Sequence, residues 1–212
     1  MSAIIFECFY PMCIYYAAGI LVSMTAGNAL DATERTALTA LLTCLAAGWI
    51  YKKECGKRNG ERKRMPGISY LIPCILGAAG NFFFSWLMGL AQVTVHFSNE
   101  VQEELLAGNI VVQILGLGIA VPIAEELIFR GLLYGNMRKY LSVWISAVFG
   151  ALLFALYHGN PVQIIYALPM GILLNLIYEK WGNLTAPVFF HMSANLSTIL
   201  LPILIEMNDK LR

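Results

Sequence analysis

Residues 110–134 have the sequence IVVQILGLGIAVPIAEELIFRGLLY, an apolar run that contains two adjacent glutamates and an arginine. This run exceeds the roughly 20 residues that an α-helix needs to cross a bilayer. A charged side chain near the middle of such a helix costs about 2.5–3.5 kcal/mol on insertion scales, so it is a candidate for function. The segment therefore predicts a transmembrane helix with a functional polar site at Glu125, Glu126 and Arg130.

The composition extends this prediction to the whole chain. Of the 212 residues, 58% are hydrophobic and 13% are charged, whereas a soluble domain carries about 25% charged residues. One soluble core of this size cannot hide so many apolar residues, and no strongly basic face is available for nucleic acid. We expect an all-α, polytopic transmembrane helix bundle in a cell membrane. Its apolar runs predict about seven spans, near residues 9–27, 36–51, 68–95, 110–134, 143–158, 162–178 and 184–205.

The basic residues predict how this bundle is oriented. Residues 52–64 hold seven basic and two acidic side chains, a net charge of +5. Basic residues in short loops stay on the cytoplasmic side. Seven spans with a cytoplasmic N-terminus place this loop, Arg138, Lys139 and Lys180 on that side together. The first basic residue is Arg35, so the first run lacks the basic start of a cleaved signal peptide and is expected to remain as a span.

We expect one membrane domain with two parts. Residues 1–108 form the N-terminal spans, including the basic cytoplasmic loop 52–64. Residues 109–206 form the core spans, which carry the polar side chains described next.

Three polar clusters lie in or beside the core spans. Glu126 and Arg130 are four residues apart, so they share a helix face and can form an ion pair, while Glu125 is turned about 100° away and is free for a second partner. His158 ends the fifth run, and Asn195 follows His191 by one helical turn within the seventh. Two plainer readings remain open: charged side chains at a membrane interface, and polar side chains that hold helices together.

Together these groups have the chemistry needed for peptide hydrolysis. A glutamate helped by a histidine can act as general base on water, and a second histidine with an amide can stabilise an oxyanion. The sequence contains no G-x-S-x-G and no H-E-x-x-H motif, and no cysteine adjoins a histidine. Water is therefore the expected nucleophile.

The three clusters resemble the motifs of a known family, the CPBP (CAAX protease and bacteriocin-processing, or Abi) intramembrane proteases. Glu125-Glu126-x-x-x-Arg130 is similar to the paired-glutamate motif of that family. Phe154-x-x-x-His158 and His191-x-x-x-Asn195 are similar to its second and third motifs. The three occur in order between residues 110 and 200, under half of the chain.

The resemblance implies a role for each residue. Glu125 and His158 would activate the attacking water, His191 and Asn195 would stabilise the oxyanion, and Glu126 with Arg130 would support the site. The substrate would be a peptide or a membrane protein in the bilayer of a bacterial cell, and the oligomeric state is left open.

The metal requirement stays open at this stage, because the family is described both with and without a metal. We favour a glutamate-activated water with no required cofactor. The alternative is a divalent metal such as zinc, held by Glu125, His158 and His191 with a fourth position for water.

A different class of function also remains possible. The same buried polar residues could belong to a non-enzymatic binding or immunity protein, or to a small transporter that relays ions or protons. Transporters often contain inverted repeats, and we find none in this sequence.

Overall fold

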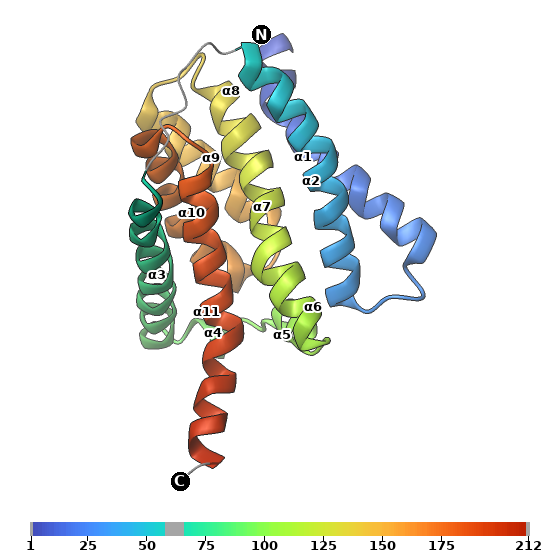
Figure 1. Ribbon diagram of the computed structural model, residues 1–212, viewed down its shortest axis with the longest axis vertical. Coiled ribbons are helices and arrows are strands. Elements are labelled where there is room, and N and C mark those ends of the chain that lie inside the picture. The colour runs from blue at the N-terminus through green and yellow to red at the C-terminus, as the bar shows by residue number, and fades with distance from the viewer. Residues whose placement is uncertain (1, 58–65, 211–212) are drawn as a thin grey trace.

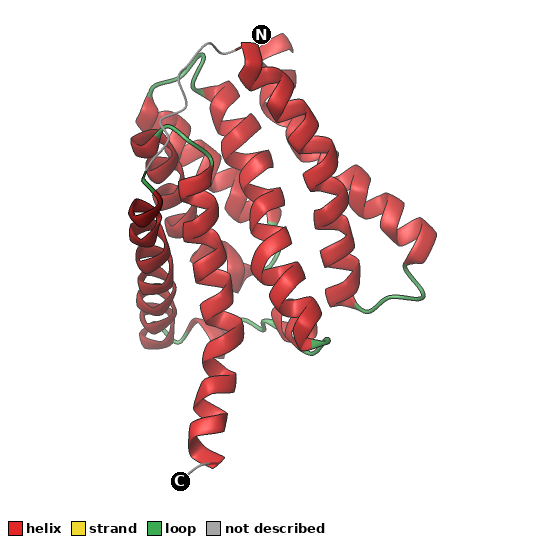
Figure 2. Cartoon of the chain, viewed as in Figure 1, coloured by secondary structure: helices red, strands yellow, loops and turns green. Residues whose placement is uncertain are grey.

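The computed structural model describes residues 2–57 and 66–210, and these residues form a bundle of helices joined by short loops, without a strand in either range (Figure 2). The predicted all-α class is confirmed. Residues 58–64 of the expected basic loop lie outside the described residues.

Eleven α-helical and three other helical segments follow one another within these ranges. They are α1 (Ser2–Ala26), α2 (Ala32–Lys57), η1 (Gly67–Tyr70), α3 (Leu71–Leu90), α4 (Val93–His96), α5 (Glu100–Leu106), α6 (Ile110–Val112), η2 (Gln113–Ala120), α7 (Val121–Glu126), η3 (Leu127–Tyr134), α8 (Gly135–Met137), α9 (Val143–Tyr157), α10 (Pro161–Trp181) and α11 (Thr185–Lys210).

Most predicted spans match a helix, and the third needs correction. A single span was expected over residues 68–95, but α3 ends at Leu90 and only the short α4 follows. The reason is Gln92, whose φ of 53° lies in the left-handed region, which interrupts a right-handed helix. The acidic segment after it contains the helix α5.

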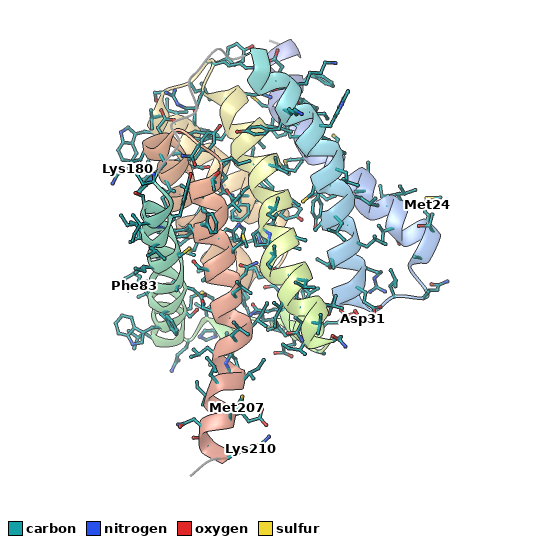
Figure 3. The ribbon with its side chains drawn as sticks, viewed as in Figure 1. Met24, Asp31, Phe83, Lys180, Met207 and Lys210 are labelled. Atoms are coloured by element: carbon teal, nitrogen blue, oxygen red, sulfur yellow. The ribbon has the colours of Figure 1, made fainter. Side chains whose placement is uncertain are left out.

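Among the described residues, five helical segments are long and apolar enough to cross a membrane: Ile5–Ala26, Gly67–Leu90, Ile110–Met137, Pro161–Trp181 and Thr185–Lys210. Helix α9 is apolar but has 15 residues, which span about 22 Å, less than the hydrocarbon thickness of about 30 Å. Large apolar side chains cover the outside of the bundle. Met24 on α1 and Phe83 on α3 are 81% and 53% exposed and point away from it (Figure 3), as expected where lipid is the solvent.

The segment Ile110–Met137 runs through the centre of the bundle (Figure 1). It contacts α2 and α11 through η2 and α7, and α1 and α9 through η3. The stretches η2 and η3 are π-helical, and they flank the α-helical turn that carries Glu125 and Glu126. Single π-helical turns occur often at functional sites.

Helix α11 packs along α3, and its last turns extend beyond the other helices to the C-terminus, at the end of the molecule opposite the N-terminus (Figure 1). Its start is fixed by Asn183, whose side chain accepts a hydrogen bond from the Ala186 amide at 3.1 Å. This cap sets the helical turns on which His191 and Asn195 face the central segment.

Candidate functional site

The site is built on a buried ion pair between Glu126 and Arg130. The Arg130 Nη1 donates to Glu126 Oε1 at 2.9 Å, and both side chains are 0% exposed. The pair predicted from the four-residue spacing is confirmed. A buried ion pair needs further hydrogen bonds to offset the loss of hydration.

Helix α10 supplies those further bonds to Arg130. Its Nε donates to Asn175 Oδ1 and its Nη2 donates to the Gly171 carbonyl, both at 3.2 Å. The Asn175 side chain in turn donates to the Ala147 carbonyl on α9 at 2.8 Å. Asn175 therefore links α9, α10 and the central segment.

Phe154 on α9 explains why an aromatic residue belongs to the second motif. The Arg130 guanidinium lies over its ring, 4.3 Å from the centroid. The same ring meets His158 and His191 edge-on, at centroid distances of 4.9 and 5.8 Å. The face of the Phe154 ring thus stabilises the buried cation, and its edges contact both imidazoles.

His191 lies between the two glutamates. Its Nδ1 is 2.8 Å from Glu126 Oε1, and its Nε2 is 3.7 Å from Glu125 Oε2. Glu126 Oε1 already accepts a hydrogen bond from Arg130, as a carboxylate does, so the Nδ1 of His191 is the donor. The prediction that His191 faces the protein interior is confirmed.

His158 is the C-cap of α9, and its Nδ1 is 2.8 Å from the Phe154 carbonyl oxygen. A carbonyl oxygen can only accept, so Nδ1 carries the hydrogen and the lone pair of a neutral ring lies on Nε2. Helix α9 therefore presents a ring nitrogen that can accept a proton or a hydrogen bond.

Asn195 lies one turn beyond His191 on α11. Its Nδ2 donates to the Leu117 carbonyl in η2 at 2.9 Å. This bond fixes the amide plane and leaves one amide hydrogen and the Oδ1 without a hydrogen-bond partner among the described residues.

A cavity of 410 Å³ brings the predicted groups together, since Glu125, His158, His191 and Asn195 all line it. Glu126 and Arg130 lie behind this wall. The rest of the lining comes from eight helical segments (α1, α2, α5, η2, α7, α9, α10 and α11), namely Tyr15, Tyr16, Thr36, Gln102, Leu105, Leu106, Leu117, Val121, Phe154, Tyr157, Gln163, Tyr166, Ala167, Met170, Leu174, Ala194, Thr198 and Ile199. This size is typical of a small-ligand site.

The zinc alternative can be compared with this geometry. Glu125, His158 and His191 line one cavity, and their residue types suit zinc. Across residues 2–57 and 66–210, however, no three His, Cys, Asp or Glu side chains are grouped closely enough to hold a metal ion. These side chains would therefore have to move before they could hold zinc.

Sequence reasoning missed two asparagines that organise the site. Asn175 anchors Arg130, and Asn81 on α3 contacts the cavity-lining residues Tyr166 and Thr198. Both lie within spans, where a polar side chain is itself a signal of buried function. That signal could have identified them, although their partners lie far away in the sequence.

Comparisons with known proteins show similarity to membrane proteases. Residues 107–197 match the sequence profile described as type II CAAX prenyl endopeptidase Rce1-like. YdiL of Bacillus subtilis (strain 168) is 23% identical over 194 residues, which cover 88% of this chain and 78% of YdiL. The membrane-embedded CAAX protease MroQ of Staphylococcus aureus (strain USA300) is 24% identical over 138 residues, 59% of this chain and 56% of MroQ.

A third relative has a higher identity over a shorter stretch. The protein YxdF of Lactococcus lactis subsp. lactis (strain IL1403) is 35% identical over 82 residues, 38% of this chain and 44% of YxdF. No solved structure matches the chain. The matched profile covers all three motifs, so residues 107–197 resemble the Rce1-like type II CAAX prenyl endopeptidase (CPBP/Abi) family, and the chain is a multi-pass membrane protein similar to bacterial membrane proteases.

Proposed function

We propose that the protein is an intramembrane endopeptidase that hydrolyses a peptide or membrane-protein substrate with an activated water. The observation that carries this proposal is the shared cavity, in which a carboxylate, two imidazoles and an amide surround one space. General base catalysis and oxyanion stabilisation need groups of these types around one substrate.

In the proposed first step, a water lies between Glu125 and the Nε2 of His158. Glu125 takes one proton from the water while His158 accepts a hydrogen bond from the other hydrogen. The water oxygen forms a bond to the scissile carbonyl carbon, and the carbonyl electron pair moves onto its oxygen. General base catalysis of this kind contributes about 10²- to 10⁴-fold to the rate.

His191 and Asn195 then stabilise the oxyanion. The Nδ1 of His191 donates to Glu126. His191 must therefore also carry a hydrogen on Nε2 in order to donate a hydrogen bond to the substrate oxyanion. When the intermediate collapses, the C–N bond breaks and the leaving nitrogen takes the proton that Glu125 received.

We further propose that the chain crosses the membrane seven times with a cytoplasmic N-terminus. The crossings would be α1, α2, α3, the segment Ile110–Met137, α9, α10 and α11. Supporting this, Lys180 lies near the N-terminal end of the molecule and the long α11 ends at the other (Figures 1 and 3). Because α1, α2 and α5 also line the cavity, residues 1–108 and 109–206 would act as one membrane domain.

The test needs no knowledge of the natural substrate. Purified protein in detergent is incubated with peptides from a digested bacterial proteome, and new peptide termini are identified by mass spectrometry. We expect cleavage by the wild type and by Glu103→Gln, a matched loss of an exposed carboxylate, and none by Glu125→Gln. Equal cleavage by Glu125→Gln would refute the mechanism, and no cleavage by any form would favour the non-enzymatic alternative.

The same assay addresses the metal. We expect EDTA to leave cleavage unchanged, since the proposed mechanism uses side chains alone. Loss of activity with EDTA and its recovery with zinc would instead support the zinc alternative at Glu125, His158 and His191.

A further inference from the structure

A second group of polar side chains lines the cavity beside the predicted catalytic residues. Gln163 and Tyr166 on α10 and Thr198 on α11 all border it, and we call these three residues the polar strip. Thr198 lies three residues after Asn195, on the same face of α11. The strip therefore continues the wall that begins at the third motif.

Asn81 on α3 fixes the hydroxyl groups of this strip. The Tyr166 hydroxyl donates to Asn81 Oδ1 at 2.7 Å, and Asn81 Nδ2 donates to Thr198 Oγ1 at 3.1 Å. The Thr198 hydroxyl donates to the Ala194 carbonyl at 3.3 Å. Both hydroxyl hydrogens are thus used within the protein, and the oxygens keep lone pairs that can only accept.

Gln163 adds an adaptable group. Its carboxamide side chain makes no hydrogen bond among the described residues, and it is partly buried at the cavity wall. A carboxamide can both accept from an N–H group and donate to a carbonyl. The strip as a whole therefore offers an excess of acceptors to whatever occupies the cavity.

Apolar side chains also line this space, among them Leu105, Leu106 and Met170. A cavity lined by both hydrogen-bond acceptors and apolar groups fits an extended peptide with apolar side chains. A helix must unwind before its peptide bond can be attacked, and each backbone N–H then loses its partner. In a membrane interior an unsatisfied backbone group costs several kcal/mol.

We infer that the polar strip binds the main-chain N–H groups of an unwound, apolar substrate segment and holds its scissile bond near Glu125. The inference rests on the proposed function, because it assigns the strip to the substrate of that reaction. It adds the conformation and chemistry of the bound segment, and it gives α3 a part in recognition through Asn81.

Binding is tested separately from cleavage, in a Glu125→Gln background. The probes are acetyl-Leu-Leu-Leu-amide and the same peptide with its main-chain amides N-methylated, titrated by calorimetry into protein in detergent and into empty micelles. We expect the parent to bind the first peptide more tightly than the second. Adding Thr198→Val or Gln163→Leu should lower the affinity for the unmethylated peptide by about 2- to 10-fold, the usual effect of one hydrogen bond. The affinity for the N-methylated peptide should stay unchanged.

Ser197→Ala is the matched control. Ser197 accepts from Asn81 Nδ2 at 2.8 Å but does not line the cavity, so this variant should bind both peptides as the parent does. Thermal unfolding of each variant checks that the fold is intact.

The outcomes separate the two proposals. The proposed role of the polar strip would be overturned by any of three results, even if the wild type cleaves peptides. These are equal affinity of the parent for the two peptides, no binding of either peptide, and unchanged affinity in both strip variants. The expected binding pattern without any cleavage by the wild type would support the proposed role of the strip and refute the proposed endopeptidase activity.

Discussion

Glu125 and Glu126 are neighbours in the sequence, yet the structure gives them different surroundings. Glu126 is fully buried, and its Oε1 accepts hydrogen bonds from both Arg130 and His191. Its Oε2 is buried without a hydrogen-bond partner among the described residues. Glu125 borders the cavity, and its Oε2 lies 3.7 Å from the Nε2 of His191. Glu126 is thus suited to hold the site together, and Glu125 to act on a substrate.

This difference predicts the effect of Glu126→Gln. Arg130 would keep its charge at a fully buried position and lose the carboxylate that balances it. Breaking a buried pair in this way costs about 3–5 kcal/mol. We expect a clear fall in the thermal unfolding temperature in detergent, and little change for the exposed control Glu103→Gln. An unchanged unfolding temperature in Glu126→Gln would show that the pair contributes no net stability.

At the scale of elements, α10 contains none of the three motifs, but it positions residues that belong to them. Asn175 accepts from Arg130 and donates to the Ala147 carbonyl, so one side chain ties α10 to α9 and to the central segment. Arg130 then orients Glu126, and Glu126 orients His191. A shift of α10 would move the imidazole that faces the cavity.

Asn175→Leu should therefore lower kcat by about 10- to 100-fold with a smaller change in KM, because small displacements of reacting groups are costly. It should also lower stability by about 1–3 kcal/mol, since two buried groups lose their partner. Steady-state kinetics on a peptide found by the library assay, together with unfolding curves, measures both effects.

Asn175→Asp is the informative companion variant. It keeps an acceptor for Arg130 and loses the donor to Ala147, so we expect it to recover most of kcat but not all of the stability. Equal loss of kcat in the two variants would argue against positioning through Arg130.

The contact between α3 and α11 depends on Gly77. A Cβ at this position would lie 2.0 Å from the Phe190 carbonyl oxygen, and backbone on α11 would have to move. Small residues allow such close helix contacts in membranes. Gly77→Ala should destabilise the protein by about 1–3 kcal/mol.

The control lies on the same helix. A Cβ at Gly89 would meet nothing within 4 Å, so Gly89→Ala should cause no loss of stability. Chemical unfolding in detergent compares the two variants, and equal stability would mean that α3 and α11 can separate at little cost.

At the scale of the whole molecule, the helices place the termini at opposite ends (Figure 1). An odd number of crossings requires this arrangement. The loop that contains Asn28 and the end of α10 at Lys180 would then face different compartments.

Cysteine labelling in a cysteine-free background tests this orientation. A membrane-impermeant maleimide should label Asn28→Cys in intact bacterial cells, and Lys180→Cys only after the cells are permeabilised. Both residues are exposed in the structure. The reverse pattern would invert the topology, and labelling of both in intact cells would contradict an odd number of crossings between them.

The sequence by itself determined the class of the protein, the central helix and the Glu126–Arg130 pair. The apolar composition leaves few alternatives to a membrane bundle, and an ion pair four residues apart follows from the helical repeat of 3.6 residues. The three motifs also carried the family resemblance before any contact between helices was known.

Only the tertiary structure decided how the helices combine these groups. The bonds from His191 to Glu126, from Asn175 to Arg130 and from Tyr166 to Asn81 join residues 65, 45 and 85 positions apart. Spacing along one helix says nothing about such pairs, because they depend on which faces of different helices pack together. The polar side chains were visible in the sequence, but their partners were fixed by helix packing.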